Sequence, residues 1–249
     1  MAEVTARAPG APTRRERLRA RTLDDLGSTT RDLLVAEGPH AVTVSAVAAA
    51  LGMSAPALYR YVDNRDGLLE LAAAAVAREL AATLIDARRA APGEPLAQTL
   101  ALCRTFRRWA LEHRREFGLL FADASVPRGI RAGSPAAPAA EALAWAFEEI
   151  VLRLWATNRF RVPADGELPA PLREALEPYR ARLTAGARAA GLDVGEVPLG
   201  ATYTLLHYWT RVYGLISMEI SGHLEHAVTD GGPLFEAVLT ELTAQVTGG

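Results

Sequence analysis

Residues 43–65 read TVSAVAAALGMSAPALYRYVDNR, and this stretch decides the fold. Its first half places apolar side chains at positions i, i+3, i+4 and i+7, which is one face of a short helix: Val44, Val47, Ala48 and Leu51. Gly52 follows, and a glycine at that point lets the chain turn in a left-handed conformation. Ser54 can then cap a second helix by accepting a hydrogen bond from the backbone N–H of Ala57. The pattern therefore predicts two short helices joined by a tight turn.

Two short helices with a glycine-containing turn form the helix-turn-helix arrangement that many DNA-binding proteins use. In the second helix Leu58 and Val62 face inward, which leaves the other faces for DNA. Small residues at its tip let the backbone approach base edges, while tyrosine and arginine can contact phosphates or bases. The predicted DNA-binding residues are Thr43, Ser45, Ser54, Ala55, Pro56, Tyr59, Arg60, Tyr61 and Arg65. A helical hairpin in some other bundle would show the same caps and spacing, so the pattern alone leaves that interpretation open.

A basic arm precedes this motif. Between Arg14 and Arg21 there are five arginines and one glutamate, although the whole chain has a net charge of −2. Local positive charge on a mildly acidic body is typical of contact with a polyanion such as DNA. A solvated tail would have the same composition, so the charge alone does not decide between the two.

The rest of the chain indicates helices separated by proline and glycine, without the alternation of a strand. We predict an all-α fold of about nine helices, over residues 13–37, 44–51, 54–61, 64–91, 95–117, 138–158, 170–190, 198–226 and 233–247. Residues 1–12 are rich in alanine, proline and glycine, and we predict that they form a disordered tail.

Composition and motifs exclude several classes of protein. No apolar run approaches the ~20 residues of a membrane span and no apolar signal segment begins the chain, so we expect a cytoplasmic protein. The single cysteine, Cys103, cannot form an intramolecular disulfide or a multi-cysteine metal site. No GxSxG, HExxH, P-loop or GxGxxG motif is found, so we predict no enzymatic activity, no cofactor and no metal. His223 and His226 have a spacing that could bind a metal, but their place before a glycine-rich loop favours an exposed pair.

Residues 41–72, AVTVSAVAAALGMSAPALYRYVDNRDGLLELA, resemble the N-terminal domain of TetR-family transcriptional regulators. The matching positions are Thr43, Gly52, Leu58 to Val62, Arg65, Leu68 and Leu69. Tyr61 stands where the family commonly has histidine and Arg65 where it commonly has lysine, and both keep a hydrogen-bond donor for phosphate. The resemblance extends over about residues 15–85.

The resemblance implies a homodimeric repressor that binds a palindromic double-stranded DNA operator and is released by a small-molecule effector. It also implies a helix-turn-helix domain over residues 13–64 and a helical ligand-binding and dimerisation domain over residues 65–249. One alternative is an all-α enzyme or small-molecule-binding protein with an incidental helix-turn-helix, which a gel-shift assay with DNA flanking the gene would test. The other is a DNA-binding activator without a ligand, which the addition of candidate ligands to that assay would test.

In the C-terminal half, residues 209–214 resemble the W-x-x-x-H-G sequence of the WHG-type domain of some TetR relatives, with Tyr213 in place of histidine. Gly214, Ser217 and Ser221 form a stripe of small residues at helical spacing, which suits the close approach of a second helix. The last two helices of the family usually build a dimer bundle, so we predict that these three residues lie in the dimer interface. Packing within one chain is the alternative.

An effector pocket requires an apolar cavity with a few polar groups. Aromatic and polar residues on the middle helices are the candidates: Phe106, Trp109, Phe121, Trp155, Tyr203, His207 and Arg211. His207 and Arg211 lie at i and i+4 on one helix face, and we prefer them as partners for an anionic or carbonyl group of the ligand. Each aromatic residue taken singly also fits ordinary core packing.

Overall fold

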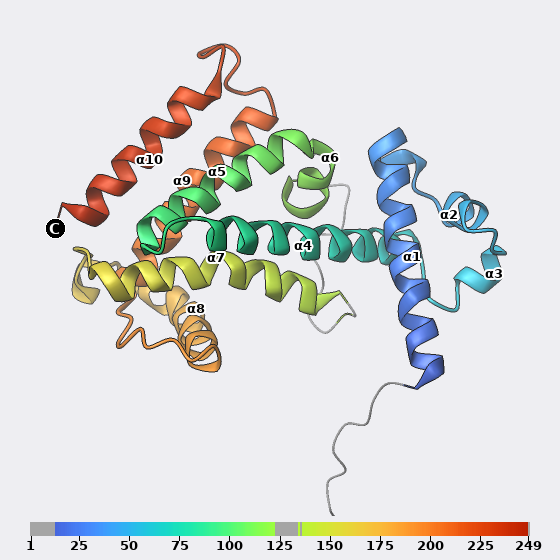
Figure 1. The fold of residues 1–249 in the computed structure, drawn as a ribbon, viewed down its shortest axis with the longest axis horizontal. Coiled ribbons are helices and arrows are strands. Elements are labelled where there is room, and N and C mark those ends of the chain that lie inside the picture. Colours follow the sequence, from blue (N-terminus) through green and yellow to red (C-terminus); the bar gives the residue numbers. More distant parts are fainter. Residues whose placement is uncertain (1–12, 123–133, 135, 249) are drawn as a thin grey trace, which may run out of the picture. The chain divides into compact units, whose positions relative to one another are not determined.

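Figure 1 shows the computed structural model, which describes residues 13–122, 134 and 136–248. Over these residues the chain is all-α, as predicted, with ten α-helices, three short helical turns and no strand. The chain divides into two units, one of residues 1–76 with 119–137 and the other of residues 77–118 with 138–249. The predicted disordered tail, residues 1–12, lies outside the described residues.

The N-terminal unit contains three complete α-helices and the beginning of a fourth. They are α1 (Arg14–Glu37), α2 (Val44–Ala50), α3 (Ala55–Leu58) and α4 (Arg65–Ala90), with a short turn, η1 (Pro39–Ala41), before α2. Their apolar faces meet in one buried cluster made of Leu26, Val47, Ala48, Leu58, Val62 and Leu68. Because α1, α2, α3 and α4 all contribute to this cluster, it holds the two short helices in place.

Local hydrogen bonds fix the two short helices as the sequence predicts. The Thr43 hydroxyl accepts from the backbone N–H of Ala46 at 3.0 Å and caps α2. The Ser54 hydroxyl accepts from the backbone N–H of Ala57 at 3.4 Å and caps α3. Gly52 has a φ of +63°, the left-handed conformation that lets the chain reverse between the two helices. The predicted cap of α3 and the predicted turn are therefore confirmed.

α1 crosses α4 closely at Gly27. A Cβ atom at this position would lie 2.9 Å from the carbonyl oxygen of Leu71. That oxygen belongs to the backbone of α4, so it cannot move aside as the end of a flexible side chain could. Glycine is therefore required here for the two helices to approach.

We expect Gly27→Ala to destabilise the N-terminal unit by about 1–3 kcal/mol, because overpacking against backbone outweighs the roughly 1 kcal/mol that alanine gains over glycine inside a helix. Thermal unfolding followed by circular dichroism measures the change. Gly93→Ala is the matched control, since a Cβ there meets no described atom within 4 Å. A melting temperature for Gly27→Ala at or above that of the wild type would contradict the close crossing.

The second unit contains the rest of α4 and six further α-helices. They are α5 (Pro95–Glu112), α6 (Arg114–Phe117), α7 (Ala137–Asn158), α8 (Ala170–Ala189), α9 (Leu199–Ile220) and α10 (Gly231–Thr247). A 3-10 turn, η3 (Asp165–Glu167), precedes α8, and a π-helical turn, η2 (Gly118–Ala122), follows α6 but belongs to the N-terminal unit from Leu119 on. α9 packs against α5, α8 and α10, so it is the central helix of this unit (Figure 1).

Three helix boundaries differ from the prediction by three residues or more. The helix predicted over residues 54–61 ends at Leu58, and residues 59–61 form a turn. The helix predicted over residues 95–117 is divided at His113, whose φ of −123° and ψ of 50° are not helical. The His113 ring stacks on Trp109, and its Nδ1 lies 2.9 Å from the Trp109 carbonyl oxygen. The helix predicted over residues 198–226 ends at Ile220, because Gly222 adopts a φ of +74° within a series of turns. The division at His113 explains why the described chain has ten α-helices where about nine were predicted.

Candidate functional site

The residues predicted to bind DNA lie on α2, α3, the start of α4 and the turns between them, all in the N-terminal unit. Six of them are exposed: Thr43, Ser45, Ser54, Pro56, Tyr59 and Arg60. Three are half-buried: Ala55, Tyr61 and Arg65. Tyr59 keeps 53 % of its surface exposed, so the end of α3 is accessible to a groove of DNA.

α3 is anchored through its apolar side chains. Leu58 is completely buried and Val62 is 7 % exposed, and both belong to the apolar cluster of the unit. Side chains that neighbour Leu58 in a helix point in other directions. Tyr59 and Arg60 are therefore exposed while the segment that carries them is held firmly.

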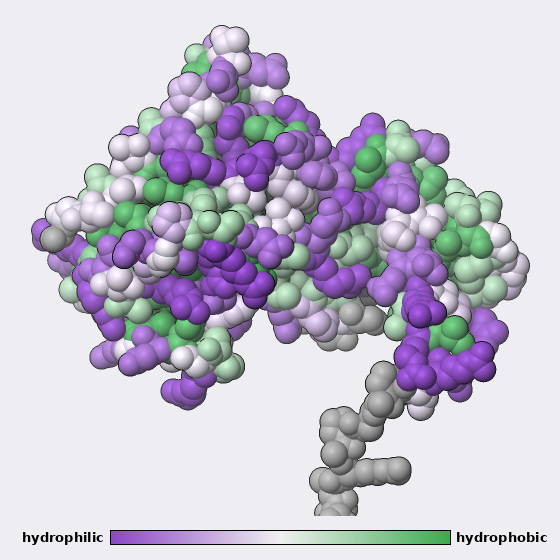
Figure 2. Space-filling view, in the orientation of Figure 1, coloured by the Kyte–Doolittle hydropathy of each residue, from purple (hydrophilic) through white to green (hydrophobic). Residues whose placement is uncertain are grey.

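The basic arm forms the first turns of α1. A capping box closes the first turn: the Thr13 N–H donates to Glu16 Oε2 at 2.6 Å, and the Glu16 N–H donates to the Thr13 hydroxyl at 3.2 Å. The hydrogen bonds from Thr13 lower the pKa of Glu16 from its usual 4.5. The five arginines of the arm are all exposed: Arg14, Arg15, Arg17, Arg19 and Arg21. Figure 2 shows hydrophilic residues gathered over these turns of α1.

One arginine of the arm contacts the segment that follows α3. The Arg19 guanidinium lies over the ring of Tyr61, with 5.4 Å from its Cζ to the ring centroid, which is within cation–π range. The same ring packs against the apolar cluster beneath α3. The arm is therefore in contact with Tyr61, and its positive charge lies beside the predicted DNA-binding residues that follow α3.

Arg65 has a local role that sequence analysis missed. Its Nε donates to the carbonyl oxygen of Val42 at 2.9 Å, and its Nη2 donates to that of Pro39 at 2.6 Å. Both carbonyls lie just before α2, so a side chain from the start of α4 fixes the entry to the helix-turn-helix. The planar guanidinium suits two such bonds, whereas a lysine ammonium is a single point charge.

The second unit contains a connected cluster of aromatic rings. Phe106 of α5 is completely buried, and its centroid lies 5.1 Å from that of Phe147 on α7 and 5.7 Å from that of Trp209 on α9. Phe117 of α6 lies 6.2 Å from Phe106 and 6.0 Å from Tyr213 of α9. We call these five residues the aromatic cluster. Phe117, Phe147, Trp209 and Tyr213 were not among the predicted pocket residues.

The structure does not gather the predicted pocket residues at one place. Phe106 lies in the aromatic cluster, and Trp109 lies near the end of α5. Trp155 belongs to one apolar cluster of the unit, and Tyr203 packs against a smaller one between α8 and α9. Phe121 belongs to the N-terminal unit. Helical spacing indicates which face of one helix is apolar, but not which other helix that face meets.

The two polar pocket candidates lie toward the surface. His207 is exposed, and its ring stacks on Tyr203 with 6.0 Å between centroids. Arg211 pairs with Glu241 of α10, with Nη2 and Oε2 2.5 Å apart. The face that His207 and Arg211 share therefore meets α10 and solvent. Of the predicted pocket residues, Phe106 is the one that lies in the aromatic cluster.

Arg107 links three helices of the second unit. Its guanidinium donates two hydrogen bonds to the Glu219 carboxylate of α9, at 2.8 and 2.5 Å. It also lies over the ring of Phe235 on α10, 5.4 Å from the centroid. Only 20 % of the arginine and 13 % of the glutamate side chain are exposed. A bidentate pair shielded from water in this way fixes the packing of α5, α9 and α10.

Two adjacent glutamates connect α7 with α4 and α8. Glu149 pairs with Arg88 of α4 at 2.5 Å and with Arg153 at 2.8 Å. Burial raises the pKa of Glu149, but the hydrogen bonds from both arginines outweigh it, so the pKa is lowered from its usual 4.5. Glu148 accepts two hydrogen bonds from Arg182 of α8. α4 is therefore joined to α7, and α7 to α8, by ion pairs within the unit.

The predicted stripe of small residues lies on α9 and the turn that follows it. A Cβ atom at Gly214 would meet no described atom within 4 Å, and Ser221 is exposed. Ser217 differs, because its hydroxyl is buried and has no hydrogen-bond partner among the described residues. Met218 on α9 and Leu234 on α10 are large apolar side chains with 45 % and 37 % of their surface exposed. This part of α9 has room for a second helix.

Other reactive side chains are few in the part of the chain that the structure describes. Burial raises the pKa of the Cys103 thiol to about 12, so the thiol is protonated at neutral pH. His223 and His226 are exposed in the turns after α9, and no described group of three or more His, Cys, Asp or Glu side chains could hold a metal ion. None of the described helices is long and apolar enough to cross a membrane.

Two family models match the chain. The model of the "Bacterial regulatory proteins, tetR family" matches residues 27–72, which include α2 and α3. The model of the "Tetracyclin repressor-like, C-terminal domain" matches residues 99–242, more than half of the 249 residues. The chain belongs to the TetR family. This TetR-family protein is a DNA-binding transcriptional regulator, and the resemblance found in the sequence is confirmed.

The TetR-family chain is similar to known regulators over most of its length. It is 28 % identical over 232 residues to the HTH-type transcriptional regulators Rv1816 of Mycobacterium tuberculosis and Mb1846 of Mycobacterium bovis, covering 92 % of this chain and of each relative. The protein SCO4313, whose crystal structure is known, is 26 % identical to this chain, with a TM-score of 0.60, and the match covers 92 % of this chain and 98 % of that one. A protein of unknown function from Rhodococcus sp. RHA1 shares the fold, with 19 % identity, a TM-score of 0.56 and coverage of 90 % and 96 %.

Proposed function

We propose that this TetR-family regulator is a homodimeric repressor that binds a palindromic operator and leaves it when a small molecule binds. The observation that carries this proposal is the end of α3, where Tyr59 and Arg60 are exposed while Leu58 is completely buried. In a two-fold dimer, each protomer presents one such helix to the major groove. The two helices then contact half-sites about one helical turn apart, ~34–36 Å.

We place the effector at the aromatic cluster, within a ligand-binding and dimerisation domain of residues 65–249 that follows a DNA-binding domain of residues 13–64. Stacked and edge-on rings offer an apolar surface with defined geometry to a small molecule. An effector acts by binding one conformation better than another and so shifts their populations. The Arg88–Glu149 pair joins α7, which carries Phe147 of the cluster, to α4. Since α4 is one continuous helix over residues 65–90, a change in its second half can affect its first.

The operator contacts are tested by removing tyrosine hydroxyls. Tyr59→Phe combined with Tyr61→Phe should weaken binding to DNA flanking the gene by about fivefold to thirtyfold, because each hydroxyl that bonds to the DNA contributes ~1 kcal/mol. Tyr59→Phe alone should account for most of the loss, since Tyr59 is exposed and Tyr61 lies under Arg19. Fluorescence anisotropy measures the affinity, with Tyr208→Phe in the second unit as the matched control.

The outcomes separate the parts of the proposal. Unchanged affinity together with an unchanged melting temperature would remove these hydroxyls from the interface. A wild-type chain that binds none of the flanking DNA would contradict the operator proposal. A chain that binds this DNA but is not released by any candidate effector would favour the ligand-free activator.

The basic arm is expected to contact phosphates. Arg14→Gln, Arg15→Gln and Arg21→Gln together should weaken binding to operator and random DNA alike, and should flatten the log–log salt dependence by about 0.9 for each side chain that contacts a phosphate. Arg19 is left in place because it lies over Tyr61. Titrations at several salt concentrations give the slope, and Arg161→Gln, exposed in the second unit, is the control. The same slope in the triple variant and the wild type would show that the arm makes no phosphate contact.

A further inference from the structure

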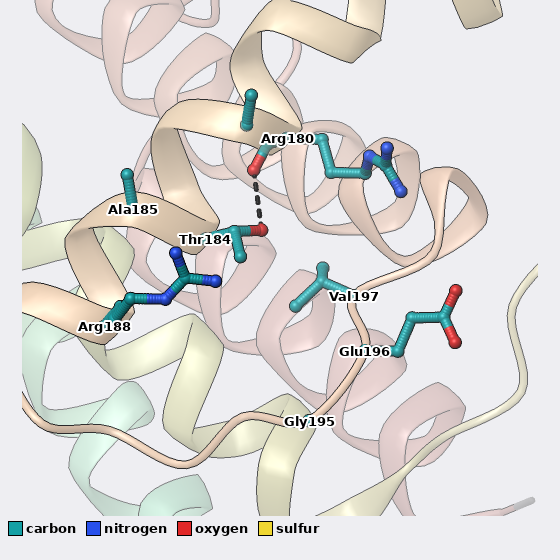
Figure 3. A pocket seen from close by; sticks show the side chains of 8 residues that line it. Arg180, Thr184, Ala185, Arg188, Gly195, Glu196 and Val197 are labelled. Atoms are coloured by element: carbon teal, nitrogen blue, oxygen red, sulfur yellow. Dashed lines mark hydrogen bonds between the residues drawn. The ribbon is translucent and has the colours of Figure 1, made fainter.

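A cleft of about 280 Å³ lies between α8 and the chain that leads into α9 (Figure 3). Its lining residues are Arg180, Ala181, Thr184, Ala185, Arg188, Gly195, Glu196 and Val197. None of them belongs to the aromatic cluster or to the DNA-binding surface. The volume falls just below the ~300–1,000 Å³ of ordinary ligand pockets, so the cleft suits a molecule smaller than a drug.

The wall of the cleft that contains Gly195, Glu196 and Val197 is fixed by hydrogen bonds from two side chains outside the cleft. Arg159, just after α7, donates from Nη2 to the carbonyl oxygen of Val194 at 2.9 Å and from Nη1 to that of Glu196 at 3.3 Å. Trp155 Nε1 donates to the same Glu196 oxygen at 3.4 Å. Arg159 itself has a φ of +45°, a costly conformation that persists because these contacts hold it. A wall that is already fixed loses little conformational entropy when a ligand binds.

The rim of the cleft has one unpaired charge of each sign. Arg180 is paired with Glu177, whereas neither the Arg188 guanidinium nor the Glu196 carboxylate has an ion-pair or hydrogen-bond partner among the described residues. In Figure 3 the Arg188 and Glu196 side chains lie on opposite sides of Val197. The apolar part of the lining is small, namely Ala181, Ala185 and Val197. The order along the cleft is therefore a cation, a short apolar stretch and an anion.

We propose that this cleft binds a small zwitterion of amino-acid size, with its carboxylate on Arg188, its ammonium group on Glu196 and its hydrocarbon part against Val197. Such a molecule has one charge for each of the two unpaired side chains and a hydrocarbon part for the apolar stretch between them. A ligand with only a negative charge would leave Glu196 unpaired, and one with only a positive charge would leave Arg188 unpaired. This site is independent of the proposed operator and effector.

Three probes of nearly equal length test the proposal on the full chain. 6-Aminohexanoate has both charges, hexanoate lacks the ammonium group and hexylamine lacks the carboxylate. We expect calorimetric or NMR titration to show saturable millimolar binding of 6-aminohexanoate, and binding about twofold to fivefold weaker for each of the other two, which is within the range for solvent-exposed ion pairs. Ala185→Trp, which fills the cleft from an exposed position, should abolish binding.

Charge variants then identify the residues. Arg188→Gln and Glu196→Gln should each weaken 6-aminohexanoate binding about twofold to fivefold, and Glu174→Gln, exposed elsewhere on α8, should not. The double variant Arg188→Glu with Glu196→Arg should restore binding, because the zwitterion can bind in the reverse direction. Equal affinity for 6-aminohexanoate and hexanoate, a double variant no better than the single ones, or the absence of saturable binding would each overturn the proposal.

Discussion

Replacing Arg65 with methionine is expected to lower the free energy of unfolding of the N-terminal unit by about 2–4 kcal/mol, because hydrogen bonds from a charged donor contribute more than neutral ones. The change removes both hydrogen bonds from the Arg65 guanidinium, so the carbonyl oxygens of Val42 and Pro39 lose this donor. The chain before α2 would lose its attachment to α4, so DNA binding should fall with stability. Thermal and urea unfolding measure the first effect, and anisotropy with operator DNA the second.

Arg65→Lys separates the two roles that an arginine can have at this position. Lysine keeps the positive charge for a phosphate, but its single ammonium group cannot reproduce the planar pair of donors. We expect Arg65→Lys to lower the free energy of unfolding by about half as much as Arg65→Met does. The lysine variant should also retain more DNA affinity than the methionine variant. A methionine variant as stable as the wild type, but weak in DNA binding, would instead make Arg65 a direct phosphate contact only.

Local chemistry explains why the helix-turn-helix could be predicted from the sequence. A cap at Ser54, a left-handed glycine at position 52 and apolar residues at helical spacing act over three to seven residues, and each is visible in the sequence. The same rules placed Leu58 and Val62 inside, and both are buried. Local preference and burial agree in this region, which makes its structure predictable.

Contacts between distant residues explain most of what could not be predicted. The two Arg65 bonds join residues 23 and 26 positions apart, and Arg19 meets Tyr61 from another helix. No local pattern distinguishes these arginines from exposed ones. The end of α5 at His113 was also not predicted, because the surrounding residues favour a continuous helix, whereas the His113 ring stacks on Trp109.

The effector region, too, could be predicted only in part from the sequence. Helical spacing correctly marks Phe106 as apolar and interior, but the rings that surround it come from α6, α7 and α9. The i, i+4 relation of His207 and Arg211 holds, but an acidic residue on α10 pairs with the arginine and the histidine remains exposed. Which face of a helix meets which neighbour is a property of the packed unit.

The largest effect on assembly is expected at Gly214. A Cβ atom at this position meets no described atom within 4 Å, so Gly214→Leu should leave the fold of one protomer intact. In a two-fold interface the same leucine is inserted twice, once from each copy. Overpacking costs about 1–3 kcal/mol at each copy, so the dimer should dissociate at least about thirtyfold more readily.

Sedimentation velocity at micromolar concentration tests this expectation, with circular dichroism to check that the helix content is preserved. Ala175→Leu adds similar bulk at an exposed position of α8 and serves as the control. DNA binding should weaken in Gly214→Leu but not in Ala175→Leu, since a single protomer offers half of the contacts and no fixed spacing between recognition helices. If Gly214→Leu forms a dimer as tight as the wild type, the interface does not include this part of α9. The exposed Met218 and Leu234 would then require another explanation.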